Sequence, residues 1–553
     1  MIYKTNTWPP TNGKDAELKR ITRRAFLTNF AKTISLAMLC VFQHSVNLQS
    51  VAYSQTSFQN PVLWEDLADG DVLRVGDRYY YSASNMHYSP GAPVLSSTDL
   101  VHWNYIGHSV PVLDFGPSYN LDGGSAYVRG TWASFLGYRK SNQTFYWGGC
   151  IDFNKTYIYT AKAAEGPWQR HAILGKCYYD ASFLVDDDDT MYISYGNTTL
   201  HVAQLSADVT KEVRSEIVFT AQKEIGMLEG SRIYKIQGNY YIFTTKPANA
   251  EYVLKSSSGP FGPYTAHVFV EDATSPVAGA GHPHQGGIVQ TAAGAWYYMA
   301  FIDAYPGGRL PVLAPMRWNA DGWPELELQK GAWGNSYPLP VIPATQSSRT
   351  QFSDSFHTSK LGPEWEWNHN PDNTKWLTGR GLLLKTATVT DDLYQARNTL
   401  THRIPGPEST VTVSIQLSQM KDGDNTGLAM LRDTSAWVGV VKEKGSYNVV
   451  LKTNLTMREG WKTANKGDIE KSIVVSGNRI WLRISTDIHP GVDRHAQFFY
   501  STDGRSFQAI GDPVKLNDSW NFFMGYRFAI FNYATQSLGG KVIVSSFDIL
   551  PSQ

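Results

Sequence analysis

A short hydrophobic phrase recurs five times in the first 350 residues. Each copy starts with a polar or glycine turn and continues as a strand-length run of aromatic and β-branched residues. The copies are DRYYYSAS, NQTFYWGG, DTMYISYG, GNYYIFTT and GAWYYMAF, with Tyr80, Tyr146, Tyr192, Tyr241 and Tyr298 as markers. The markers lie 46 to 66 residues apart, roughly the length of one four-stranded propeller blade. The pattern predicts a five-bladed β-propeller, with an ordinary tyrosine-rich β-sandwich as the alternative.

The pattern changes after about Pro343. The segment YPLPVIPATQSSRTQ is rich in Pro and Ser and has no apolar period, as expected of a linker. From Phe352 onward, apolar and polar positions alternate in turn-bounded runs, which predicts a two-sheet sandwich of the concanavalin-like jelly-roll type. The runs are GLLLKTAT, TVTVSIQL, WVGVVKE, SYNVVLKT, RIWLRIS, AQFFYST, RFAIFNYA and KVIVSSFDI. Long helical periodicity is nearly absent. The chain is therefore predicted to be all-β, with a catalytic propeller over 58–345 and a sandwich over 352–553.

The first 52 residues have the pattern of a targeting segment. Basic residues at 19, 20, 23 and 24 precede the apolar run AFLTNFAKTISLAMLCVF, and SVA at 50–52 offers small residues for cleavage. The apolar part is too short for a membrane span. The phrase TRRAFLT also resembles a twin-arginine export signal. We expect a secreted, extracellular protein.

Composition excludes some partners and favours others. The 553 residues include 49 basic and 49 acidic side chains, so the net charge is zero. We therefore expect no nucleic-acid partner, and no membrane partner after signal removal. Aromatic residues reach 13%, with 17 Trp and 31 Tyr. Such rings fill β cores, and they also provide the faces on which sugar rings dock.

The cysteines and sequons also bear on the compartment. Cys40 lies in the targeting segment, which leaves Cys150 and Cys177 as a candidate disulfide in an oxidising compartment. Their number and spacing do not suit a zinc site. Five sequons offer glycan sites in a eukaryotic host. They start at Asn142, Asn154, Asn197, Asn454 and Asn517.

Three acidic residues occupy a special position relative to the repeats. Asp69, Asp180 and Glu229 each come just before the expected innermost strand of a blade, where a propeller opens into a funnel. Cleavage of an acetal needs one protonated carboxyl group and one ionised carboxylate. A third carboxylate can hold the pKa of the acid up by like-charge repulsion. We therefore expect Glu229 to be the general acid, Asp69 the general base and Asp180 the pKa modulator.

Several segments of the chain resemble a known family. The segments NPVLWEDLADGDVLRVGDRYYY, GTWAS, CYYDASFLVDDDDTMYISYG, EGSRIYKIQGNYY, HQGGIV and PGGRLPVLAPMRW resemble family 43 glycoside hydrolases, which are inverting enzymes on a five-bladed propeller. The resemblance runs from about Asn60 through the whole chain. SPGAPVL, PGGRLPVLAP, WEWNHNPD and ARNTLTHR further resemble the fungal-type α-L-arabinofuranosidases that act on doubly substituted xylose in arabinoxylan.

The resemblance implies the same three carboxylate roles and adds candidates for substrate binding. It implies that the axial histidine is His284, which in some members contacts calcium or an ordered water cluster. Arg309 would reach a substrate hydroxyl beside the acid, and Trp132 would lie against the sugar in the central subsite. Trp520 is a candidate for the rim of the site or for the core of the sandwich. Tyr179, beside Asp180, is a candidate for shaping the pocket or for plain packing.

One position departs from the family pattern. The family commonly has Asp-Pro at the base, whereas Asp69 is followed by Gly70. Losing the proline frees the backbone but leaves the carboxylate in place. We therefore keep Asp69 as the predicted base, with Asp66 and Asp71 as alternatives.

These observations predict an inverting, exo-acting glycosidase that releases α-1,3-linked L-arabinofuranose from arabinoxylan or arabinose-substituted xylo-oligosaccharides. No cofactor is required, and calcium at His284 is left open. A β-xylosidase or an arabinanase of the same family is an alternative, as is a carbohydrate-binding propeller without turnover. Family 32 fructosidases share the two-domain plan, but the chain has no WMNDPNG-like opening.

Overall fold

The computed structural model describes residues 56–340, 351–491 and 494–551. The predicted targeting segment 1–52 and most of the linker lie outside these ranges. Within them, every element is a β-strand or a short 3-10 helix, so the chain is all-β as predicted. Among the same residues, no helix has the length and apolar character needed to cross a membrane.

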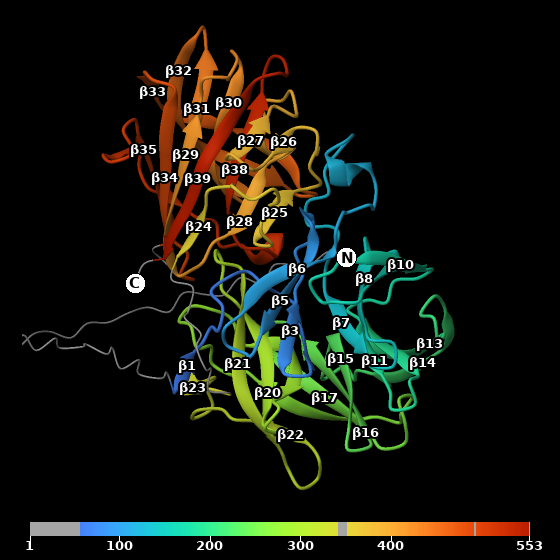
Figure 1. Ribbon diagram of the computed structural model, residues 1–553. Helices are drawn as coiled ribbons and strands as arrows, with labels where there is room; N and C mark the ends of the chain where they lie inside the picture. Colours follow the sequence, from blue (N-terminus) through green and yellow to red (C-terminus); the bar gives the residue numbers. More distant parts are fainter. Residues whose placement is uncertain (1–55, 341–350, 492–493, 552–553) are drawn as a thin grey trace, which may run out of the picture. The chain divides into compact units, whose positions relative to one another are not determined.

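The first part of the chain forms five four-stranded antiparallel sheets, the blades of a propeller (Figure 1). The blades are β2 (Asp71–Val75), β3 (Arg78–Ser82), β5 (Gly91–Ser97) and β6 (Asn104–Val110); β7 (Ser134–Arg139), β8 (Thr144–Ile151), β9 (Lys155–Ala161) and β10 (Gln169–Leu174); β11 (Ser182–Val185), β12 (Met191–Asn197), β13 (Thr199–Leu205) and β14 (Glu212–Thr220); β15 (Glu229–Ile236), β16 (Asn239–Lys246), β17 (Ala250–Ser256) and β18 (Thr265–Glu271); and β19 (His284–Gln290), β20 (Trp296–Asp303), β21 (Arg309–Trp318) and β22 (Pro324–Leu326). The five marker tyrosines lie in β3, β8, β12, β16 and β20, the second strand of each blade. The repeat therefore predicted the blades correctly.

Contacts between distant parts of the chain hold the blades in place. β1 (Ser57–Gln59) pairs with β23 (Ser336–Pro338), which joins the start of the propeller to its end. Trp103 and Trp168, in the segments that follow the first two repeats, are buried. Cys150 at the end of β8 forms a disulfide with Cys177, as the cysteine count suggested. This bond ties the second blade to the segment that enters the third.

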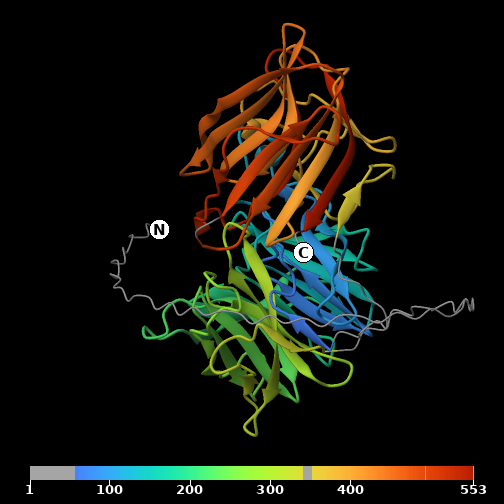
Figure 2. The same ribbon diagram turned by 90° about the vertical axis from the view of Figure 1, so that its left-hand side faces the viewer.

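The second part of the chain is a sandwich of two large sheets, drawn in orange and red in Figure 2. One sheet contains β24 (Phe352–Asp354), β26 (Trp376–Leu377), β27 (Leu382–Lys385), β29 (Glu408–Gln416), β34 (Arg479–Asp487), β35 (His495–Ser501), β36 (Gln508–Ala509), β37 (Val514–Lys515) and β39 (Lys541–Pro551). The other contains β25 (Trp365–Asn368), β28 (Leu400–Arg403), β30 (Asp424–Leu431), β31 (Thr434–Glu443), β32 (Ser446–Arg458), β33 (Lys462–Val475), β38 (Arg527–Ala534) and the propeller strand β4 (Tyr88–Ser89). Alternate residues of both sheets meet in one aliphatic and aromatic core, as expected for facing sheets.

Propeller and sandwich share backbone pairing and buried charge, and they belong to one compact unit from Ser54 onward. β4, from the propeller segment, pairs with β25 of the sandwich. Glu366 on β25 is fully buried and binds Arg403, Arg527 and the propeller residue His108. A buried ionic group tolerates the loss of water only when it is paired in this way. The sandwich is therefore built onto the propeller through contacts that are costly to separate.

Candidate active site

A left-handed backbone residue lies at or next to each of the three predicted carboxylates. Asp69 and Asp180 adopt left-handed conformations, with φ of 57° and 48°, two residues before β2 and β11. Asp tolerates this region better than most residues, because its short side chain bonds locally. In the fourth blade the left-handed residue is Gly230, with φ of 70°, and a register shift follows Glu229 at the start of β15. Bulges and left-handed turns re-aim side chains and are frequent beside active sites.

Asp69 is buried and bonded to a cation. Its Oδ1 accepts a hydrogen bond of 2.8 Å from Nη1 of Arg309, and its Oδ2 accepts one of 2.7 Å from the Ser84 hydroxyl. Only 4% of Asp69 is exposed. The guanidinium stabilises the negative charge, because charge-assisted bonds are strong where water is excluded.

The glycine that follows Asp69, where the family commonly has proline, has a steric reason. A Cβ atom at this position would lie 2.0 Å from the Tyr81 hydroxyl oxygen. That hydroxyl is fixed, because it donates a hydrogen bond of 2.8 Å to the Leu67 carbonyl. A proline also carries a Cβ, so it cannot follow Asp69 while Tyr81 is in place. The substitution leaves Asp69 in contact with Arg309.

Glu229 is half-buried and has only uncharged donors. Its Oε2 accepts hydrogen bonds of 2.9 Å from the Tyr179 hydroxyl and of 2.9 Å from Nδ2 of Asn197. Burial raises the pKa of Glu229, and the charge of Asp69 raises it further, against the opposing effects of the two hydrogen bonds and of the Arg309 charge. Asn197 is one of the sequon residues, and a glycan on its amide would disturb the contact with Glu229.

Asp180 lies against the same carboxyl group. Its Oδ2 accepts a hydrogen bond of 3.2 Å from the backbone N–H of Gly230. Burial raises the pKa of Asp180 well above its ordinary value, and the charges of Glu229 and Asp69 add to the rise. The upward shift of the pKa is thus shared by Asp180 and Glu229.

Arg232, on the same strand as Glu229, binds the backbone segments that lead into β2 and β11. It is 1% exposed. Its Nη2 donates to the carbonyls of Asp69 at 2.8 Å and Gly70 at 3.1 Å, and its Nη1 donates to the Ala181 carbonyl at 3.4 Å. No sequence pattern indicates this role, because backbone carbonyls have no residue signature.

Arg309 connects Asp69 to the sandwich. Its Nε donates a hydrogen bond of 3.1 Å to the backbone carbonyl of Phe523, and its side chain contacts Asp69 rather than Glu229. The expectation that Arg309 reaches a substrate hydroxyl beside the acid stays a prediction. Its Nη2 is buried and makes no hydrogen bond within the described protein, so one donor remains for a bound hydroxyl.

The alternative bases have other partners. Asp66 accepts hydrogen bonds from the backbone N–H groups of Arg309 at 2.8 Å and Gly525 at 3.0 Å, which joins propeller to sandwich. Asp71 accepts one of 2.9 Å from Leu136 N–H and lies 3.5 Å from the Nε atom of Arg232. Both carboxylates are buried in structural contacts. These contacts favour Asp69 among the three candidates.

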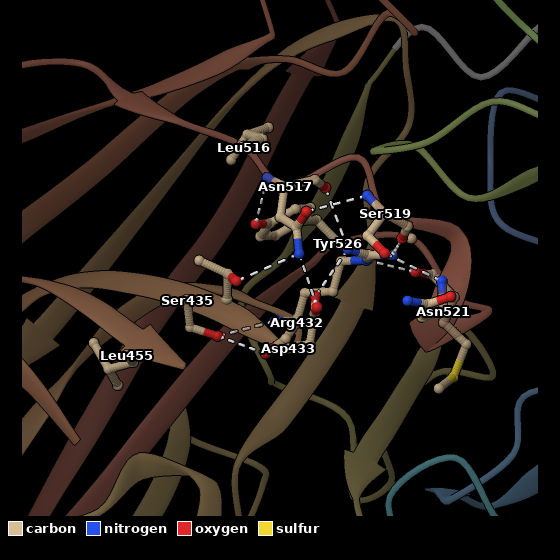
Figure 3. Close-up of polar contacts among 12 residues, drawn as sticks. Arg432, Asp433, Ser435, Leu455, Leu516, Asn517, Ser519, Asn521 and Tyr526 are labelled. Carbon is tan, nitrogen blue, oxygen red and sulfur yellow. Dashed lines mark hydrogen bonds and ion pairs between the residues drawn. The ribbon is translucent and has the colours of Figure 1, made fainter. Parts of the chain in front are cut away.

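The sandwich loop 517–525, which carries Phe523, is held by one buried arginine. Arg432 donates to the carbonyls of Met524 at 2.8 Å and Asn517 at 3.2 Å, and also to that of Ser519. Figure 3 shows Arg432 among these residues, with Asn517 also bonded to Asp433. The arginine satisfies carbonyls that the tight loop cannot pair by itself. It thereby fixes the loop whose Phe523 carbonyl binds Arg309.

Five side chains form a run of aromatic contacts that we call the aromatic rim. It consists of Trp520, Phe523, Trp132, Phe153 and Tyr179. Successive ring centroids are 5.4, 5.0, 6.0 and 6.0 Å apart. Trp520 is 57% exposed, so it is a surface residue rather than part of the sandwich core. The run ends at Tyr179, whose hydroxyl binds Glu229. Sequence reasoning named Trp132, Tyr179 and Trp520 but missed the other two rings.

His284 begins β19 at the position equivalent to Glu229, again before a register shift. Its Nδ1 lies 2.8 Å from the His282 carbonyl, and its ring packs edge-on to Phe301 at 4.5 Å. Calcium prefers six to eight oxygen ligands. The described residues contain one convergent group of three His, Asp or Glu side chains, at Glu408, Asp487 and His489, and His284 is not in it. Calcium at His284 stays a prediction.

Taken together, these contacts give the site two carboxyl environments. On one side the Asp69 carboxyl group binds a guanidinium, and on the other burial raises the pKa of Glu229, whose hydrogen-bond donors are uncharged. This is the division that acid–base cleavage of an acetal needs.

Comparison with known proteins agrees with this chemistry. A model of the glycosyl hydrolases family 43 matches residues 58–324, and a model of the β-xylosidase C-terminal concanavalin A-like domain matches residues 353–549. A solved GH43 glycoside hydrolase is 46% identical, with a TM-score of 0.87, over 90% of this chain and 100% of its own. The chain belongs to glycoside hydrolase family 43. This glycosidase is thus a five-bladed propeller with a concanavalin A-like sandwich, as predicted.

Named relatives of this family 43 glycosidase fall into two activity groups. A β-xylosidase of Formosa agariphila is 28% identical over 89% of this chain and 90% of its own length. A non-reducing end α-L-arabinofuranosidase of Bacteroides ovatus is 27% identical over 75% and 79%. The solved relative described above was engineered to display both endo-xylanase and exo-arabinofuranosidase activity.

Proposed function

We propose that this protein is an inverting, exo-acting α-L-arabinofuranosidase that releases arabinose from arabinoxylan, with α-1,3-linked arabinose on doubly substituted xylose as its target. The observation that carries the glycosidase part of the proposal is the pair of opposed carboxyl environments at Asp69 and Glu229. The 46% identity to a protein whose engineered form shows exo-arabinofuranosidase activity supports the choice of sugar.

In the proposed reaction, Glu229 donates its proton to the glycosidic oxygen as the bond to the anomeric carbon breaks. Asp69 accepts a proton from the water that attacks the opposite face of the sugar, which inverts the anomeric configuration. Asp180 keeps the pKa of the acid high. Each proton transfer has a side chain to carry it, so the scheme requires no cofactor.

The remaining predicted residues have proposed binding roles. Trp132 lies against the sugar, Arg309 offers its free Nη2 to a sugar hydroxyl, and Trp520 contacts the substrate at the rim. Tyr179 orients the acid through its hydroxyl. His284 would line the axial end of the pocket.

A β-xylosidase is the second candidate. The observation that favours it is the similarity to the β-xylosidase of Formosa agariphila along 89% of this chain. Both activities need the same acid and base, so the carboxylates do not distinguish them. The shape of the sugar pocket decides.

The test uses defined xylo-oligosaccharides that carry one or two arabinose units on a single xylose, with unsubstituted xylobiose alongside. We expect release of arabinose from the doubly substituted compound, and NMR should show the β-anomer first. Xylose released from xylobiose, without arabinose from the others, would replace the proposal with the β-xylosidase. Arabinose released only from singly substituted compounds would overturn the target while keeping the activity.

We further propose that the protein is exported. The Cys150–Cys177 disulfide supports this, because such bonds persist in oxidising compartments. Mass spectrometry of the secreted and cellular fractions of the native host tests it.

A further inference from the structure

Phe153 is an apolar ring that the fold leaves in water. It lies in the turn between β8 and β9 and is 63% exposed. Its neighbours in the sequence are polar, so hydrophobic packing does not explain a phenylalanine at this point. A single exposed ring needs no explanation by itself. Phe153 differs from other exposed rings in its backbone conformation and its aromatic neighbours.

The turn holds Phe153 in a conformation that has to be supported. Asp152 and Phe153 both have φ of 54°. Two successive left-handed residues that are not glycine are costly and persist only where the surroundings fix them. The Asp152 carboxylate supplies that support, because its Oδ1 accepts hydrogen bonds of 2.6 Å from the Tyr119 hydroxyl and 3.0 Å from Nε of Arg129. The ring is therefore presented by a clamped turn.

The ring faces the acid side of the site. Its centroid lies 6.0 Å from that of Tyr179, with 25° between the planes, and 6.0 Å from that of Trp132. The Tyr179 hydroxyl binds Glu229. The hydrogen bonds of Asp69 go instead to Ser84 and Arg309. Phe153 thus lies one ring away from the proposed acid.

The position of Phe153 relative to Glu229 decides which sugar unit would contact the Phe153 ring. In an inverting glycosidase the acid protonates the leaving oxygen, and the base lies across the sugar that is released. The sugar bonded to the leaving oxygen is therefore on the side of the acid. In the proposed reaction this sugar is a xylopyranose of the xylan backbone. Its C–H face matches an aromatic ring.

We propose that Phe153 is the stacking platform for a xylose unit of the backbone, on the leaving-group side of the site. The proposal rests on the proposed function for the position of the acid. It makes Phe153 a specificity-determining residue for the polymer and leaves the released sugar to other residues.

The test measures binding in a Glu229→Gln background, which stops turnover. Isothermal titration measures the affinity for xylotetraose and for free arabinose. It compares the protein that keeps Phe153 with the Phe153→Ala variant and with Phe153→Tyr, which keeps the ring. We expect Phe153→Ala to weaken xylotetraose binding about 10-fold, the effect of a lost apolar contact, and to leave arabinose binding unchanged. Phe153→Tyr should retain the affinity. Leu377→Ala, on the sandwich and also 63% exposed, is the matched control.

Equal xylotetraose affinity for Phe153→Ala and the parent would overturn the proposal, as would an equal loss for both sugars. The proposed function fails separately, when the unmodified protein releases no arabinose from substituted oligosaccharides. An exposed side chain contributes little to folding, so an unchanged Tm for Phe153→Ala confirms that the readout is binding.

Discussion

Asp69 and Glu229 reach the same site from different blades, yet their surroundings differ in charge. Asp69 binds the guanidinium of Arg309, whereas Glu229 accepts from a phenol and an amide. The first arrangement stabilises a carboxylate. Around Glu229, burial and a neighbouring negative charge raise the pKa. The comparison shows that partners, not residue type, set the charge environment of each carboxyl group.

Glu366 of the sandwich adds a third case. It is more deeply buried than Glu229, and burial raises its pKa as well. Arg403 and Arg527 nevertheless hold the pKa of Glu366 well below its ordinary value. Burial alone therefore does not produce an acid. A protonated carboxyl group at neutral pH also requires that no cation lies against it.

Removing either carboxylate should have the largest effect. We expect Asp69→Asn and Glu229→Gln each to lower kcat on arabinoxylan by about 10²–10⁴-fold, the usual worth of acid–base catalysis. An aryl glycoside with an acidic leaving phenol needs little protonation, so Glu229→Gln should keep more activity on it than Asp69→Asn does. Steady-state kinetics on both substrates measure this. The opposite ranking would exchange the two roles.

Asp180→Asn tests the coupling on the acid side. Without the like charge, the pKa of Glu229 should fall, so the proton that catalysis needs is lost at lower pH. The alkaline limb of kcat/KM should move to lower pH, with about 100-fold less activity at the optimum of the unmodified protein. An alkaline limb that stays in place would remove Asp180 from the role of modulator.

The same variant should be more stable. A carboxyl group whose pKa is raised in the folded state loses stabilisation as pH rises from 3.8, its ordinary value, towards the raised pKa. Asparagine cannot ionise and avoids this loss. Thermal unfolding above that window should give a higher Tm for Asp180→Asn, and equal Tm values at low pH provide the control.

Arg309→Gln tests the base side. It removes a charge-assisted hydrogen bond worth about 1.5–3 kcal/mol, which corresponds to about 10- to 150-fold in kcat/KM. The exposed pair of Arg317 with Glu325 offers Arg317→Gln as a matched control. Since the positive charge of Arg309 lowers the pKa of Glu229, the variant should also move the alkaline limb of the pH profile to higher pH. An alkaline limb that stays in place would argue against this electrostatic effect.

Arg432→Gln should have the smallest effect on turnover. It loosens the loop that brings the Phe523 carbonyl to Arg309, so we expect a loss of a few fold in kcat/KM and a lower Tm. Arg432→Lys should recover part of the stability but not the three-carbonyl contact, because lysine lacks the planar fork. Activity that is unchanged while the Tm falls would limit Arg432 to a structural role in the sandwich.

Much of the architecture could be read from local patterns. The tyrosine markers predicted the second strand of every blade, since alternating strands repeat with the blade. The three carboxylates were found from their position before innermost strands, and the cysteine pair from composition and compartment. These features depend on near neighbours in the chain, which a sequence displays directly.

The electrostatic assignment depended on contacts that no local pattern shows. Arg309 binds Asp69, 240 positions away, and is held by a backbone carbonyl of the sandwich. No sequence pattern marks Phe153, and only the fold places its ring against that of Tyr179. The sequence by itself determined the strands, the blades and which carboxylates lie at or just before the first strand of a blade, because these follow from periodicity. Only the tertiary structure decided which carboxylate meets a cation, because a pKa depends on charges and burial that the folded chain assembles from distant segments.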